Sequence, residues 1–484
     1  MKATFLSPLL ALCLLLGGCG PEERIWWSPN GQEAAVLVGG ALYLVKPDGA
    51  LGDPLTSGIA DKSATPSALS WLPDGSGFVL CRQRKIARWA EMAKLLPPQE
   101  ASKVELLARA MPTLLEGAEK LAGQPSDVEA LLASLSSGDP DDFLNALLCA
   151  FQNQKKAVKR ALLKLPKGAE LVAELNGDSS RFTLYEICLI KLQSGREDGA
   201  PKSLARSLYV MAQPRVSPGQ TAVGYIKMQA QSPSVQISSL DGGEQLAVCE
   251  SATFDWSPDG RSIVFAAPVG EKDGPLKNIR KVTVIQESGA LMKRESDAKA
   301  PDAMPPPVDL AMALLPDPPR LQALPDGRVL FASQAATFPA AGAGPESDQK
   351  LYVVSEDGKK IEAIATAPGA LPASLSCFVA SPDGKLAAVV DGANDAVAVV
   401  DLASGVTEVV SPAHPDWHCT TIPAWRSSAE LSFAALDKPD GSPAWMLWSK
   451  AGGVRSISGK WPAQATGDWL KKDDKKVEPS GPSQ

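Results

Sequence analysis

Histidine is nearly absent from this sequence, which restricts the chemistry that the chain can carry. Its 484 residues include only two histidines, so imidazole bases and imidazole metal ligands are scarce. The patterns G-x-x-x-x-G-K-[ST], G-x-G-x-x-G after a strand, and G-x-S-x-G are all missing. The chain therefore shows no sign of a phosphate-binding loop, a dinucleotide-binding turn or a hydrolase nucleophile elbow.

Cysteine does not occur in the spacing of a zinc or redox site. No C-x-x-C pair is present after Cys19, so neither zinc binding nor thioredoxin chemistry is indicated. Because export permits disulfides, the later cysteines are either paired or buried as free thiols. They are Cys81, Cys149, Cys188, Cys249, Cys377 and Cys419.

Basic residues are outnumbered by acidic ones, 48 to 55, and the formal net charge is −7. An acidic chain without a basic stripe argues against nucleic acid as the main partner. The segment 155–165 is the exception, because it is strongly basic and is predicted to be a helix. This segment either contacts an anionic surface or is a solvated helix face.

The N-terminus lacks a hydrophobic run long enough to remain as a transmembrane helix. Its short apolar core, Leu9–Leu16, follows the positive charge of Lys2 and is typical of an export signal. The closing residues Leu16–Cys19 (LGGC) resemble the lipobox of bacterial lipoproteins at every position. The resemblance implies cleavage after Gly18 and lipid attachment to the thiol of Cys19, with an acyl chain such as palmitate on its amine. A plain secretory signal that ends in cysteine is the alternative.

Such a lipid would anchor the chain to a membrane. Two or three acyl chains bind a bilayer firmly, since each buried methylene contributes about 0.8 kcal/mol. Gly20 rather than aspartate follows Cys19, which in a Gram-negative envelope favours the periplasmic side of the outer membrane over the inner membrane. Residues 1–18 are accordingly predicted to be a signal peptide, and residues 19–23 a lipidated tether.

Turn-forming residues are abundant, with 40 glycines and 41 prolines, and a phrase close to W-S-P-D-G recurs along the chain. Proline presets φ at the first corner, aspartate or asparagine bonds the local backbone, and glycine takes the left-handed position. An alternating apolar run follows most copies, as expected for a hairpin. The copies are Trp27–Gly31, Trp71–Gly75, Val216–Gln220, Trp256–Gly260, Ala323–Gly327, Ala380–Gly384 and the decayed Trp425–Ala429. Their turn residues are Pro29, Gly31, Pro73, Asp74, Gly75, Pro258, Asp259, Gly260, Pro325, Asp326, Gly327, Pro382, Asp383 and Gly384.

A second set of glycine turns alternates with the first. Each repeat therefore reads strand a, turn, strand b, connection, strand c, glycine turn, strand d. Four antiparallel strands repeated seven times predict an all-β chain that folds as a seven-bladed β-propeller, and six or eight blades would also fit. A β-sandwich or a pair of barrels is the alternative fold. The glycines of the second set are Gly49, Gly195, Gly242, Gly289, Gly358, Gly405 and Gly452.

These two sets of turns resemble the bacterial WD40-like repeats, called PD40, of the TolB propeller domain. The resemblance covers most of residues 24–460 apart from the inserts, and it implies a propeller in the cell envelope. The third and seventh turns depart from the pattern, and the N-terminal domain of TolB has no counterpart. The resemblance therefore implies the fold and the compartment rather than the role of TolB.

The spacing between turns locates the inserted segments. Successive prolines lie 44 residues apart from Pro29 to Pro73, but 145 apart from Pro73 to Pro218. Since one blade takes about 40–45 residues, blade two carries a large insertion, and its apolar residues have helical spacing. The predicted domains are blade one and the first part of blade two at 24–85, a helical insertion at 86–166, the rest of the propeller at 167–464, and a disordered tail at 465–484.

Topology predicts which end of the strands carries the long segments. In an up-and-down meander the a–b and c–d turns share one end, and the b–c and d–a connections share the other. We expect all turns of the first kind to be tight. The helical insertion, residues 334–349 and the Pro-rich residues 296–319 are all assigned to the second end. A protein or peptide partner is predicted on that face, because scaffolded loops commonly carry function. The alternative is that insertions gather wherever the fold tolerates them.

Both histidines lie in one short loop, together with a carboxylate and a thiol. His414, Asp416 and His418 are weak candidate metal ligands, and Cys419 is adjacent. The loop contains proline, so helical facing of the ligands cannot be assumed, and an ordinary polar loop is the alternative. No catalytic residue and no cofactor is predicted.

Two functions follow from these observations. The first is a membrane-anchored envelope lipoprotein whose propeller is a non-catalytic scaffold for a protein or peptide. The second is an extracytoplasmic propeller enzyme or metal-dependent binding protein that uses the face around His414 and His418. Similar propellers occur in prolyl oligopeptidases, but those enzymes add a hydrolase domain for which this chain has no elbow motif.

Overall fold

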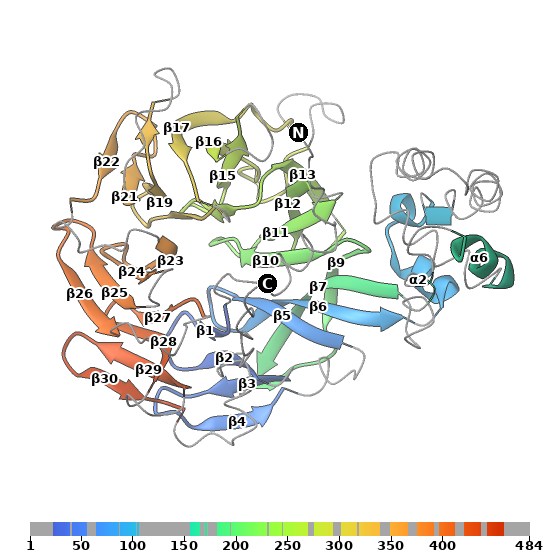
Figure 1. The fold of residues 1–484 in the computed structure, drawn as a ribbon, viewed down its shortest axis with the longest axis horizontal. Helices are drawn as coiled ribbons and strands as arrows, with labels where there is room; N and C mark the ends of the chain where they lie inside the picture. Colours follow the sequence, from blue (N-terminus) through green and yellow to red (C-terminus); the bar gives the residue numbers. More distant parts are fainter. Residues whose placement is uncertain are drawn as a thin grey trace, which may run out of the picture. The chain divides into compact units, whose positions relative to one another are not determined.

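Figure 1 shows a computed structural model of the chain. It describes residues 23–458 except 39–40, 56–63, 87, 103, 106–154, 165–168, 170–171, 173–181, 194, 230–231, 244, 270–274, 294–301, 317–318, 339–348, 366–374, 392–395, 412–420 and 437–442. Contacts divide the chain into two compact units. Unit 1 comprises Met1–Pro54, Pro268–Lys281 and Val308–Gln484, and unit 2 comprises Leu55–Ala267 and Val282–Pro307.

The described residues form seven small antiparallel sheets that follow one another along the chain, the strand pattern of a propeller. Sheet one contains β1 (Ile25–Trp27), β2 (Ala34–Val38), β3 (Ala41–Val45) and β4 (Leu51–Pro54). Sheet two contains β5 (Ala64–Trp71), β6 (Gly77–Ile86), β7 (Phe182–Gln193), β8 (Arg196–Glu197) and β9 (Lys202–Ser207). Sheet three contains β10 (Met211–Val216), β11 (Ala222–Gln229), β12 (Ser232–Ser239) and β13 (Gln245–Glu250).

The remaining four sheets repeat the same order of strands. Sheet four contains β14 (Phe254–Trp256), β15 (Ser262–Pro268), β16 (Leu276–Thr283), β17 (Val308–Leu314) and the added β20 (Ala336–Thr337). Sheet five contains β18 (Leu321–Ala323), β19 (Val329–Ser333), β21 (Lys350–Val354) and β22 (Ile361–Ala363). Sheet six contains β23 (Leu375–Ala380), β24 (Leu386–Asp391), β25 (Val397–Asp401) and β26 (Thr407–Ser411), and sheet seven contains β27 (Ala424–Ser427), β28 (Glu430–Leu436), β29 (Pro443–Ser449) and β30 (Gly453–Ser456). The predicted seven-bladed β-propeller is confirmed.

The repeated phrase forms the predicted corner between the first two strands of a sheet. At Trp256–Gly260, the Gly260 N–H donates to the Ser257 carbonyl oxygen at 2.8 Å, and Gly260 has a φ of +68°. Asp259 accepts from the Ser257 hydroxyl at 2.5 Å and from the Arg261 N–H at 3.0 Å. The corner is therefore closed by groups that lie within five residues of one another. The glycines of the matching corners, Gly31, Gly75, Gly327 and Gly384, also have positive φ.

The tryptophan of the phrase links one blade to the preceding one. The indole N–H of Trp256 donates to the carbonyl oxygen of Arg215 in β10, at 2.8 Å. In the decayed last copy, Trp425 donates in the same way to the carbonyl oxygen of Val379 in β23. In these two copies the large apolar ring is buried while its N–H reaches a backbone acceptor in the preceding blade.

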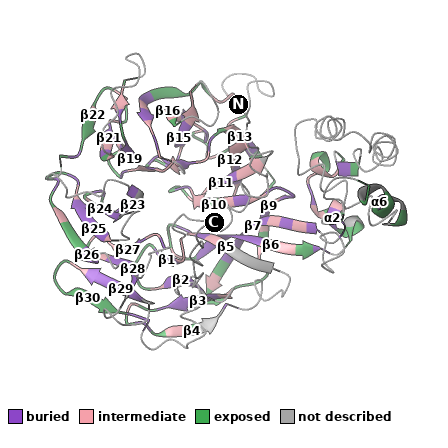
Figure 2. Cartoon of the chain, in the orientation of Figure 1, coloured by how far each residue is buried: buried purple, intermediate pink, exposed green. Residues whose placement is uncertain are grey.

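Apolar side chains between neighbouring sheets make up the core, and Figure 2 shows the buried residues concentrated on the strands. In unit 1, Trp27 of sheet one packs in one cluster with Phe433 and Trp445 of sheet seven. In unit 2, Val79 of sheet two packs in another cluster with Tyr225 of sheet three. In both clusters, adjacent blades bury apolar side chains against each other.

Blade four departs from the predicted topology. The assignment of residues 296–319 to the link between blades four and five is wrong, because Val308–Leu314 is β17, the last strand of that blade. β17 pairs with β16 from Leu276↔Leu314 to Lys281↔Val308. The c–d connection is therefore residues 284–307, and the expectation that every c–d turn is tight is wrong as well.

Proline explains this error. Pro305–Pro307 is exposed and lacks backbone N–H groups, so it cannot lie within a central strand, although a strand can begin directly after it. The Gly289 turn closes only an isolated bridge between Ile285 and Leu291. Val284 and Ile285 also donate to the carbonyl oxygen of Arg261. The long connection of blade four thus starts beside the W-S-P-D-G corner, at the end of the strands where only tight turns were expected.

The corner glycine provides a test of how firmly the turn chemistry is required. We expect Gly260→Ala to lower the free energy of unfolding by about 2–5 kcal/mol, because left-handed φ costs about 1–2 kcal/mol and overpacking adds about 1–3. A Cβ at Gly260 would lie 2.8 Å from the Gly219 nitrogen, whereas one at Gly199 would meet nothing within 4 Å. The control is Gly199→Ala, at a φ of +79°. It should lose only the free energy that left-handed φ costs an alanine. Equal losses in denaturant unfolding would show that the close packing does not matter.

No helix in the described part of the chain combines the length and the apolar character needed to span a membrane.

Candidate functional site

The helical insertion leaves sheet two at the end opposite its Pro-Asp-Gly corner. β6 and β7 pair along their whole length, from Gly77↔Lys191 beside the corner to Ile86↔Phe182. Residues 87–181 therefore start and finish at one end of the sheet, as predicted for a b–c connection. The described helices in this stretch are α2 (Trp89–Leu95) and α6 (Lys155–Leu162). Residues 98–102 are also helical.

An apolar cluster joins the start of the insertion to the blade. Met92 on α2 is fully buried, and Phe182 and Leu184 at the start of β7 are buried against the same cluster. Figure 1 draws α2 next to the end of β6. The base of the insertion is thus part of the core of unit 2. The buried members of this cluster are Ile86, Met92, Leu96, Val104, Phe182, Leu184 and Leu208.

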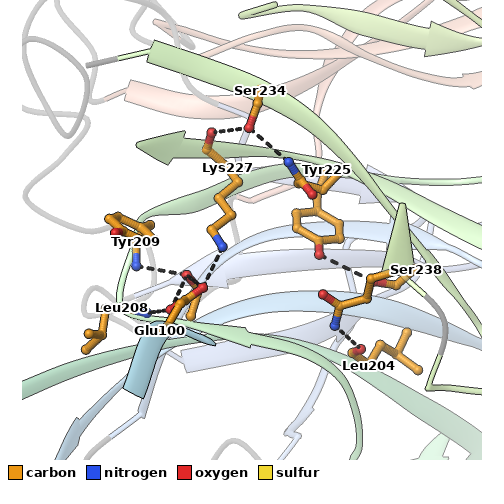
Figure 3. Close-up of polar contacts among 11 residues, drawn as sticks. Glu100, Leu204, Leu208, Tyr209, Tyr225, Lys227, Ser234 and Ser238 are labelled. Carbon is orange, nitrogen blue, oxygen red and sulfur yellow. Dashed lines mark hydrogen bonds and ion pairs between the residues drawn. The ribbon is translucent and has the colours of Figure 1, made fainter. Parts of the chain in front are cut away.

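Glu100 attaches the insertion to two blades at once, as Figure 3 shows. Its carboxylate accepts from Lys227 Nζ at 2.5 Å, from the Ser207 hydroxyl at 3.0 and 3.1 Å, and from the Leu208 N–H at 3.0 Å. Lys227 Nζ also lies 5.0 Å from the centre of the Tyr209 ring. Ser207 ends the last strand of blade two, and Lys227 lies near the end of β11 in blade three. The Glu100 side chain is only 11% exposed, so these charge-assisted bonds are shielded from water.

A second carboxylate, Glu186, holds the three strands beneath the insertion together. Its side chain on β7 is fully buried. Arg82 on β6 donates through Nε at 3.0 Å, and Arg206 on β9 donates through Nε at 2.9 Å to the other oxygen. Arg84 NH1 lies 3.5 Å from the Glu186 carboxylate. A buried ion needs such partners, since an unpaired charge in the interior is very unfavourable.

These contacts connect the base of the insertion to blades two and three. Charged side chains from β6, β7, β9 and β11 are paired there. Residues on the outer surface of the insertion base, such as Glu91 and Gln99, remain exposed. A rigid scaffold that presents exposed helical residues is suited to recognising another macromolecule.

Two other ionisable groups in the middle of blades two and three are held neutral. Burial raises the pKa of the Cys188 thiol to about 12. The charge of Arg82 lowers this pKa, and the charge of Glu186 raises it. Burial likewise raises the pKa of Tyr225 to about 12, and its hydroxyl lies 3.3 Å from the Ser238 hydroxyl. Near neutral pH, therefore, Cys188 supplies no thiolate nucleophile and Tyr225 supplies no phenolate base.

The residues predicted from the sequence fall into two groups. The turn residues lie at the corners of sheets one, two, four, five and six. Cys19, Gly18, His414, Asp416 and His418 lie outside the described residues. Within the described ranges, no group of three or more His, Cys, Asp or Glu side chains could hold a metal ion.

Sequence reasoning missed both carboxylates of this region. Glu186 did carry a signal, because it is the one acidic residue in the mostly apolar strand Phe182–Gln193. Glu100 carried none, because its partner Lys227 is 127 residues away in the sequence. Only the folded arrangement of β7, β9 and β11 places Glu100 beside Lys227.

No protein-family model matches the chain, and no curated protein matches it either. Solved structures with a similar backbone include TolB from Acinetobacter baumannii, at 17% identity and a TM-score of 0.37 over 56% of this chain and 58% of that one. They include the β-propeller domain of the Trilobed protease from Pyrococcus furiosus, at 12% identity and a TM-score of 0.35 over 58% and 76%. Prolyl oligopeptidase B from Galerina marginata matches at 10% identity and a TM-score of 0.45 over 93% and 52%. The chain thus spans little more than half the length of the TolB structure, and the likeness extends to the fold alone.

Proposed function

We propose that this chain is a lipid-anchored protein of the cell envelope whose propeller binds a protein or peptide without catalysing a reaction. The observation that carries the binding role is the attachment of the insertion to two adjacent blades through Glu100 and its apolar base. The anchor is supported by the export signal and by the lipobox resemblance at Leu16–Cys19.

The partner is proposed to bind the end of blades two and three that carries the insertion. The apolar base attaches the insertion to blade two, and the pair of Glu100 and Lys227 adds a charged contact to blade three. The link from Glu100 to Lys227 fixes the direction in which the insertion of blade two projects relative to blade three. Fixed orientation lowers the entropy that is lost when a partner binds.

Photo-crosslinking in native membranes tests this assignment. A photoreactive amino acid would replace Glu91 or Gln99 on the insertion base, both exposed. The controls would replace Asp241 or Ala290, which are exposed at the corner end of blades three and four. We expect a discrete crosslinked product from the first pair and none from the second.

Crosslinks of equal strength from all four sites, or from the controls alone, would contradict the assignment.

The second candidate function, which rests on the sequence, is an enzyme or metal-dependent binding protein that works through His414 and His418. It would be favoured if the purified protein held a stoichiometric metal that His414→Ala and His418→Ala both removed.

A further inference from the structure

The basic helix α6 differs in charge from the rest of the chain. Residues 155–164 read KKAVKRALLK and contain five basic residues and no acidic one, in a chain whose net charge is −7. The helical hydrogen bonding continues past Leu162, since the Leu163 N–H donates to the Lys159 carbonyl oxygen at 3.1 Å. Leu163 can therefore be placed on the same helical wheel as α6.

The wheel divides this segment into a buried face and a basic face. At about 100° per residue, Lys159, Leu163, Lys156 and Arg160 follow one another around a single arc of roughly 100°. Val158 lies outside this arc and is 1% exposed. Lys156, Lys159 and Arg160 are exposed, and Leu163 is 51% exposed. Burial of Val158 thus turns the basic arc toward solvent.

The position of Leu163 distinguishes this arc from an ordinary solvated helix face. A solvated face places polar side chains outward, whereas here a large apolar side chain lies in the middle of the basic residues. None of Lys156, Lys159 and Arg160 forms an ion pair within the described part of the chain. The Nε group of Arg160 donates to the Lys156 carbonyl oxygen at 3.3 Å, and its charge still faces outward.

We infer that Lys156, Lys159, Arg160 and Leu163 form a contact surface for a bilayer of anionic phospholipids. Headgroup phosphates would neutralise the three cations, and Leu163 would enter the boundary between headgroups and acyl chains. A nucleic acid or another phosphate polymer would match the charges but offer no apolar layer to Leu163. The surface acts independently of the lipid proposed at Cys19, so either contact can be tested without the other.

Vesicle binding by the mature chain with Cys19→Ser tests the inference, because no lipid is then attached to the protein. We expect the protein to sediment with vesicles of phosphatidylcholine and phosphatidylglycerol in equal parts, but not with phosphatidylcholine alone. The binding should weaken as salt rises. Replacing Lys156, Lys159 and Arg160 together by glutamine should reduce the vesicle partition coefficient about 100-fold, at about fivefold per basic residue.

Two matched variants separate a specific surface from general charge attraction. The first variant removes the same charge from three exposed lysines elsewhere, through Lys359→Gln, Lys360→Gln and Lys385→Gln together. It should change the partition coefficient by less than about twofold. Leu163→Gln should lower the vesicle partition coefficient about tenfold, because glutamine cannot enter the apolar boundary of the bilayer. The variant should still fold, because Leu163 is 51% exposed. The inference would be overturned if the protein bound both kinds of vesicle equally, or if both triple variants lost binding equally. It would also be overturned if the protein bound duplex DNA as strongly as vesicles and Leu163→Gln left the DNA binding unchanged.

Discussion

Glu186→Ala should lower the free energy of unfolding by about 3–5 kcal/mol, the loss expected when one partner of a buried ion pair is removed. Glu186 is fully buried, and both of its carboxylate oxygens accept charged donors. The alanine would leave Arg82 and Arg206 beside a cavity without the carboxylate that compensates them. Equilibrium unfolding in denaturant, monitored by tryptophan fluorescence, measures the loss.

An exposed ion pair provides the matched control for Glu186. Glu362 lies 2.7 Å from Lys360, but its side chain is 48% exposed, so Glu362→Ala should change the free energy of unfolding by no more than about 1 kcal/mol. Glu186→Gln keeps the volume and one acceptor, and its loss should fall between the two. A loss below about 1 kcal/mol for Glu186→Ala would mean that the arginines are solvated and that the network does not hold the strands together.

Cys19→Ser should move the protein from the membrane fraction to the soluble fraction. Two or three acyl chains give an anchor that survives washing, whereas a single chain binds with a constant of only about 10⁴ M⁻¹. Without the Cys19 thiol the diacylglyceryl group has no attachment site. Fractionation of cells followed by a high-salt wash of the membranes measures the shift, because salt also removes the charge attraction inferred for α6.

Cys13→Ser is the matched control for the anchor. Cys13 lies within the apolar core Leu9–Leu16 and before the expected cleavage point, so its replacement should leave the protein in the membrane fraction. If the Cys19→Ser protein stays in the washed membranes, the lipid assignment is wrong. If both variants leave the membrane, the export signal rather than the lipid has been damaged.

Turn chemistry carried most of the fold prediction, because it acts between residues that are close in the sequence. Asp259, for example, bonds a hydroxyl two residues before it and an N–H two residues after it. Such contacts need no knowledge of the rest of the chain. Blade four shows where this reasoning fails: Pro305–Pro307 reads as a loop, and only pairing with β16 shows that Val308 begins a strand.

The sequence by itself determined the repeated antiparallel sheets, the corner residues and the position of the helical insertion between β6 and β7, whereas the structure fixed the number of sheets at seven. The tertiary structure alone decided that Glu100 meets Lys227 and that Glu186 meets Arg82 and Arg206. The physical reason is distance along the chain. A turn is specified by its own few residues, whereas a buried ion pair depends on strand register and on which strand ends come together.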